Sequence, residues 1–112
     1  MTYYHAGPCG LTEILPPAIT GAPSCASYGA PKVCDRASVY VTTSLSAAIG
    51  FASLVPPHGR GVVYEVEPVN PRPDPDCSAP GLSFEADSAT VIRRVFVPGK
   101  LLKQARKIMV AA

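Results

Sequence analysis

The sequence predicts a single α+β domain, spanning residues 1–112, in which strands and helices follow one another without regular alternation. A chain of 112 residues is long enough to bury one hydrophobic core and too short for two. In several short segments rich in β-branched and aromatic residues, apolar and polar positions alternate as in half-buried strands. Two other segments have apolar residues at the spacing of a helix face. Thirteen prolines and nine glycines indicate that much of the remainder is loop.

The N-terminal part of the chain predicts one strand followed by turns. Residues 2–5 are extended and aromatic in character and form the first expected strand. Residues 7–31 contain five prolines and four glycines, and Glu13 is the only charged residue among them. This composition indicates a connected set of turns, with one short helical turn expected near residues 11–15.

A strand that turns directly into a helix is expected next. Residues 38–42 form the strand, and Thr43 or Ser44 is suited to cap the helix, because a side-chain hydroxyl accepts from the free N–H groups of the first turn. Gly50 allows another element to approach this helix closely. Pro56-Pro57 is expected to end it. The apolar face of the helix consists of Leu45, Ala48, Ile49, Ala52 and Val55.

The C-terminal half predicts two strands and a second helix. Residues 58–61 are expected to form a turn, and residues 62–67 alternate as a strand. Four prolines exclude residues 71–80 from being a helix or a central strand. Residues 90–97 predict the last strong strand, and residues 100–109 predict an amphipathic helix.

Bulk properties favour a cytoplasmic protein without a membrane or metal partner. The net charge is +2, the longest basic run is Arg93-Arg94, and no segment has the pattern of a secretion signal or a membrane span. Cys9, Cys25, Cys34 and Cys77 contain no C-x-x-C pair, which argues against a zinc site. Free, partly buried thiols are expected rather than disulfides.

Three segments carry the strongest functional signal. They read YYHAG at Tyr3–Gly7, VYVTTSLSAAI at Val39–Ile49 and GVVYEVEP at Gly61–Pro68. In this order and spacing they resemble the "FYHGT", "IYFTATLDAAI" and "GRIYIVEP" segments of the rifamycin ADP-ribosyltransferases. The resemblance covers roughly residues 3–7 and 38–98. It implies a fold of two small mixed or antiparallel sheets around an NAD cleft, with one or two helices, and an enzyme that consumes NAD.

The resemblance assigns the NAD contacts to two strands and the turn that follows the second. It implies that His5 hydrogen-bonds the ribose hydroxyls and that the small residues Ala6 and Gly7 let the backbone meet the nicotinamide carboxamide. Tyr40 is expected to stack on the nicotinamide, whose positive charge before cleavage attracts an aromatic face. Thr42 and Ser44 are expected to serve the turn and the helix cap first, with ligand contact as a secondary role.

The catalytic carboxylate is left open among three residues. Cleavage of NAD passes through an oxocarbenium-like state, which a carboxylate stabilises while it orients the nucleophile. Family members carry an acidic residue in a "FEDDPN"-like loop after the Val-Glu-Pro strand, which makes Asp74 the first choice and Asp76 the second. Glu85 is the third, because many wider ADP-ribosyltransferases carry a glutamate just before a late strand.

The acceptor of the ADP-ribose is also left open. Rifamycin-modifying members have an aspartate where this chain has Ser46, and a tryptophan where it has Gly50-Phe51. The acceptor is therefore either a rifamycin-type hydroxyl or a protein, a nucleic acid or water, and the oligomeric state is open as well. Two alternatives to this function are an NAD-dependent RNA 2′-phosphotransferase and a non-catalytic NAD-binding or interaction module of the same fold.

Overall fold

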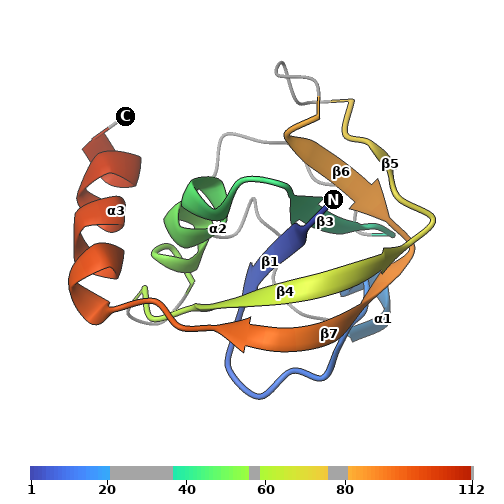
Figure 1. Ribbon diagram of the computed structural model, residues 1–112, viewed down its shortest axis with the longest axis horizontal. Coiled ribbons are helices and arrows are strands. Elements are labelled where there is room, and N and C mark those ends of the chain that lie inside the picture. Colours follow the sequence, from blue (N-terminus) through green and yellow to red (C-terminus); the bar gives the residue numbers. More distant parts are fainter. Residues whose placement is uncertain (21–36, 56–58, 76–80, 112) are drawn as a thin grey trace.

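The computed structural model shows a mixed α/β fold with one antiparallel sheet and three helices (Figure 1). It describes residues 1–20, 37–55, 59–75 and 81–111. The strands, in the spatial order β2-β7-β4-β1-β3-β6-β5, are β1 (Tyr3–Gly7), β2 (Glu13–Ile14), β3 (Val39–Thr42), β4 (Val62–Val69), β5 (Arg72–Pro73), β6 (Ser83–Ala86) and β7 (Ser88–Val95). The helices are α1 (Pro17–Thr20), α2 (Leu45–Ala52) and α3 (Gly99–Ala111). The expected strands at both ends of the chain, the strand-helix unit and the C-terminal helix are therefore confirmed.

Two expectations about the fold are wrong. The described strands form one hydrogen-bonded sheet of seven strands, where two sheets were expected. The helical turn expected near residues 11–15 is replaced by β2, because Ile14 is buried in the core when Glu13 and Ile14 pair with Thr90 and Ala89 of β7. The helical turn begins instead at Pro17, and proline is well suited to the first position of a helix.

Strand β4 is the centre of the core and is buried on both faces. Val62, Tyr64 and Val66 point into one cluster, together with the valines of β3. Val63 points to the other face, where it packs with Ala48 and Ala52 of α2. On the same side of the strand as Val63, Glu67 is exposed, and Glu65 is half-buried and pairs with Arg93.

Helix α2 begins and ends through specific hydrogen bonds. Ser44 is the N-cap and accepts from the N–H of Ala47 over 3.1 Å, which confirms one of the two expected caps. The helix ends at Ala52, before the prolines that were expected to end it, and the Ala52 carbonyl accepts from the N–H groups of Val55 at 3.3 Å and Gly61 at 2.9 Å. A Cβ on Gly50 would lie 3.2 Å from Sδ of Met109, so the close approach expected at this glycine is made by α3.

Two further expectations concern membranes and thiols. No helix in the described ranges is long and apolar enough to cross a membrane. Cys9 is a free thiol and is exposed, where partial burial was expected. Cys25, Cys34, Cys77 and the prolines at 56–57 lie outside the described residues.

Candidate functional site

Strands β1 and β3 meet at one residue pair and then diverge, which opens the sheet beside His5. The ladder between them consists of Tyr4 opposite Thr42. At the next position of β1, the imidazole reaches across to the other strand, and its Nδ1 lies 2.8 Å from the carbonyl oxygen of Tyr40. A side chain therefore takes the place of the next backbone contact between the strands. The two residues lie next to each other in space although 35 positions separate them in the sequence.

The partner of Nδ1 determines the tautomer of His5. A carbonyl oxygen can only accept, so Nδ1 donates and the neutral ring keeps a lone pair on Nε2. Burial lowers the pKa of His5 below its usual 6.5, and the hydrogen bond to Tyr40 opposes that effect in part. The ring is consequently neutral near pH 7 and offers Nε2 as a hydrogen-bond acceptor.

The two small residues after His5 lie on opposite faces of β1. Ala6 packs towards the α2 cluster. Gly7 is buried, and a Cβ there would lie 3.5 Å from Nε2 of His5 and 3.4 Å from Cδ1 of Leu11. A side chain at position 7 would thus contact both the acceptor nitrogen of His5 and Leu11, and glycine keeps this space free of a Cβ.

Tyr40 lies beside Glu85 on one face of the sheet. The two residues are directly opposite in the antiparallel ladder between β3 and β6. Residues paired in this way have their side chains on the same face, with Cβ atoms about 4.5 to 5.5 Å apart. Both side chains are half-buried. The ring of Tyr40 faces away from Val39 and Val41, which are in the core, and it belongs to neither core cluster in the described part of the chain.

Strand β5 adds a cation to this face. Arg72 pairs with Glu85 in the next ladder, and its guanidinium donates to Asp87 at 3.0 Å and to the Ser38 hydroxyl at 3.0 Å. Hydrogen bonds from Asn70 and Arg72 lower the pKa of Asp87. Tyr40, Glu85, Arg72, Ser38 and Asp87 together are called the polar face below. Sequence reasoning missed Arg72 and Ser38, because their positions depend on the pairing of two short strands.

The other acidic candidates occupy different environments. Asp74 is 4% exposed and accepts from the hydroxyl of Ser83 at 2.9 Å, while its N–H donates to the Ser83 carbonyl. These bonds hold Asp74 at the end of the ladder between β5 and β6. Asp76 lies outside the described residues. Of the described candidates, Glu85 is the one paired directly with Tyr40.

Thr42 and Ser44 use their hydroxyls within the fold. Thr42 Oγ1 donates to the carbonyl of Leu82 at 2.8 Å and accepts from the N–H of Ser44 at 3.1 Å. Ser44 Oγ caps α2. These bonds fit the turn and cap roles expected first for both residues.

No group of three or more histidine, cysteine, aspartate or glutamate side chains in the described ranges could hold a metal ion. A scan against protein-family models found no match to this chain, and a search of curated proteins found none either.

Proposed function

We propose that this chain is a mono-ADP-ribosyltransferase of the kind that its three motif segments resemble. It cleaves NAD, used as a co-substrate, and transfers ADP-ribose to an acceptor. The observation that carries the proposal is the order of three adjacent strands in the sheet: β1 with His5, β3 with Tyr40 and β6 with Glu85. Residues that are 35 and 45 positions apart are thereby brought to neighbouring strands at the point where the sheet opens.

Each residue offers what one part of NAD requires. His5 presents a neutral acceptor nitrogen, which suits a ribose hydroxyl that donates a hydrogen bond. Tyr40 presents a half-buried ring outside the core, which suits the cationic nicotinamide ring. Arg72 lies on the same face and is paired with Asp87 at 3.0 Å, so it offers a substrate guanidinium N–H donors rather than an uncompensated positive charge.

The role of the carboxylate goes to Glu85 in this proposal. When the glycosidic C–N bond breaks, its electron pair leaves with nicotinamide, which departs as a neutral molecule and requires no general acid. The positive charge that remains on the ribose is stabilised by a nearby carboxylate. The acceptor oxygen then bonds to the ribose carbon, and its proton passes to Glu85 or to solvent. Asp74 suits this role less well, because it is buried and already accepts from Ser83.

The test is nicotinamide release from NAD by the purified protein, with and without a rifamycin and with a cell lysate as a source of acceptors. We expect release that Glu85→Gln lowers by about 100-fold or more. Asp74→Asn should leave the rate within about threefold, since an asparagine oxygen can still accept from Ser83. NAD should also raise the melting temperature of the wild type and of both variants. No release, with no thermal shift by NAD, overturns the proposal. A thermal shift without release would identify a non-catalytic NAD-binding module instead.

A further inference from the structure

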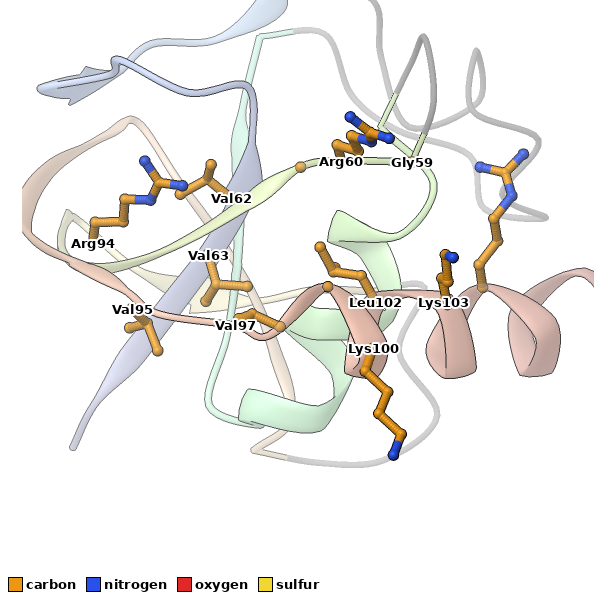
Figure 2. A pocket seen from close by; sticks show the side chains of 13 residues that line it. Gly59, Arg60, Val62, Val63, Arg94, Val95, Val97, Lys100, Leu102 and Lys103 are labelled. Atoms are coloured by element: carbon orange, nitrogen blue, oxygen red, sulfur yellow. The ribbon is translucent and has the colours of Figure 1, made fainter.

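A concave surface lies at the other end of the molecule from the polar face. It is a groove of about 810 Å³ between the ends of β4 and β7 and the start of α3 (Figure 2). In Figure 1, α3 lies on the far side of α2 from β3 and β6. Valine and leucine side chains form part of its walls, among them Val62, Val95 and Leu102. The groove therefore shares no residue with the proposed NAD site.

The charged residues that line this groove are all cations. They are Arg60, Arg94, Lys100, Lys103 and Arg106. Arg106 Nη1 donates to the carbonyl of Ser53 at 3.2 Å, which is a neutral partner, and no ion pair joins Arg106 to an acidic side chain among the described residues. The sequence contains no aspartate or glutamate after Asp87, whereas six lysines and arginines follow that residue. The small net charge of the chain thus conceals a strongly basic region.

The cations come from three segments and do not form one compact cluster. Arg60 lies in the connection before β4, Arg94 near the end of β7, and the other three on α3. Figure 2 shows Arg60, Arg94 and Lys103 on one side of the groove, while Lys100 points away from them. Charges spread along a groove match a linear polyanion better than a single phosphate.

An exposed aromatic residue lies next to groove residues in the chain. Phe96 stands between Val95 and Val97, which line the groove, and it is 85% exposed but is not itself a lining residue. Single-stranded nucleic acid is bound by basic grooves that follow the backbone together with aromatic rings on which bases stack. We propose that this groove binds single-stranded nucleic acid, with phosphates along Arg60, Arg94, Lys103 and Arg106 and a base on Phe96.

The shape of the groove argues for a chain-like partner rather than a membrane. A bilayer surface is flat and cannot follow a concave wall to reach Arg106, which lies against Gly59 and Ser53. An acidic peptide would satisfy the cations but would not supply a planar base for Phe96. The proposal is independent of the NAD chemistry and is tested without NAD.

The test is fluorescence anisotropy of labelled 20-nucleotide dT and rU strands, titrated with the full-length protein over a series of KCl concentrations. With four phosphate contacts, log K should fall against log salt with a slope of about −3, since each contact to a single strand contributes about −0.7. Lys103→Glu should weaken binding and make the slope shallower by at least about 0.7. The matched control is Lys107→Glu, an equal charge change one turn along α3 outside the groove, and it should weaken binding far less.

Phe96→Ala separates stacking from charge. It should weaken binding roughly 5- to 150-fold, the range for one lost base–aromatic stack, and leave the salt slope unchanged. Equal loss from Lys103→Glu and Lys107→Glu, or an unaltered affinity in Phe96→Ala, would overturn the proposal. Binding to phosphatidylserine vesicles or polyglutamate as tight as binding to the oligonucleotides would also overturn it.

Discussion

The two wings of the sheet differ in what covers their faces. In the wing of β7, β4 and β1, the central strand is buried on both sides, by Tyr64 in one cluster and Val63 in the other. In the wing of β3, β6 and β5, one side packs into the core, while the other carries Tyr40, Glu85 and Arg72. Strand β4 therefore leaves no free face for a ligand at the centre of the first wing, and His5 contributes to the proposed site from the edge of that wing, on β1. The comparison indicates that the first wing mainly maintains the fold, while the second carries most of the proposed chemistry.

The largest expected effect is on the stability contributed by the first wing. Tyr64 is 2% exposed, and its hydroxyl donates to the Pro8 carbonyl and accepts from the N–H of Leu11. Tyr64→Ala should lower the free energy of unfolding by about 3 to 5 kcal/mol, as expected for loss of a buried aromatic side chain. Chemical denaturation followed by circular dichroism measures this. Tyr40→Ala is the matched control, and an equal loss in that variant would remove the distinction between the wings.

Two glutamates test the same comparison through activity. Glu85→Gln should lower the rate of nicotinamide release about 100- to 1000-fold, the usual effect of deleting one electrostatic group at a reacting centre. Glu65, on β4, pairs with Arg93 in the first wing. Glu65→Gln should leave the rate within about twofold and lower stability by less than about 1 kcal/mol, because the ion pair is partly exposed. Similar rates for both variants would contradict the assignment of chemistry to the second wing.

The pH dependence of stability reports on His5. Its folded pKa lies below 6.5, so the unfolded chain binds a proton first as the pH falls. The free energy of unfolding should therefore decrease from about pH 6.5 down to the folded pKa and then level off, with a slope of at most about 1.4 kcal/mol per pH unit. His5→Gln should remove this decrease. The pKa of Asp87 is also lowered, and its contribution should be lost only as the pH falls below its usual value of 3.8, so the decrease due to His5 begins at a higher pH. A decrease that persists in His5→Gln would assign the effect to another group.

The smallest expected effect concerns the packing of α2 on α3. Gly50→Ala should favour the helix by about 1 kcal/mol through backbone propensity. The new Cβ would lie 3.2 Å from Sδ of Met109, and a flexible thioether can shift by a few tenths of an ångström. The change in melting temperature should thus be a small increase. A large decrease would show that α3 is held more rigidly against α2 than its side chains indicate.

The sequence predicted the parts of the fold that local patterns determine. The alternation around Tyr40, the hydroxyl of Ser44 and the apolar spacing of α2 and α3 are signals that do not depend on distant residues. Strands β2 and β6 were missed, because strands of two and four residues form through pairing with distant strands and carry little periodicity of their own. The single connected sheet was missed for the same reason, since it depends on the one pair between Tyr4 and Thr42.

The residues of the candidate site could be chosen from the sequence, but which of them lie next to one another could not. His5, Tyr40 and Glu85 can be chosen from motifs, whereas the ranking of Asp74 above Glu85 depended on loop similarity. The ladder between β3 and β6 places Glu85 beside Tyr40, and burial holds Asp74 against Ser83. The basic groove escaped notice because the overall charge of +2 averages over acidic and basic parts of the chain.

The most direct measurement is the affinity for NAD of the wild type and Tyr40→Ala, by isothermal titration calorimetry with Tyr40→Phe as the control. If the ring of Tyr40 holds the cationic nicotinamide, Tyr40→Ala should weaken binding roughly 30-fold, and Tyr40→Phe should bind nearly as the wild type does. Equal affinity in all three proteins, or no NAD binding by the wild type, would contradict the placement of an NAD site between β1, β3 and β6.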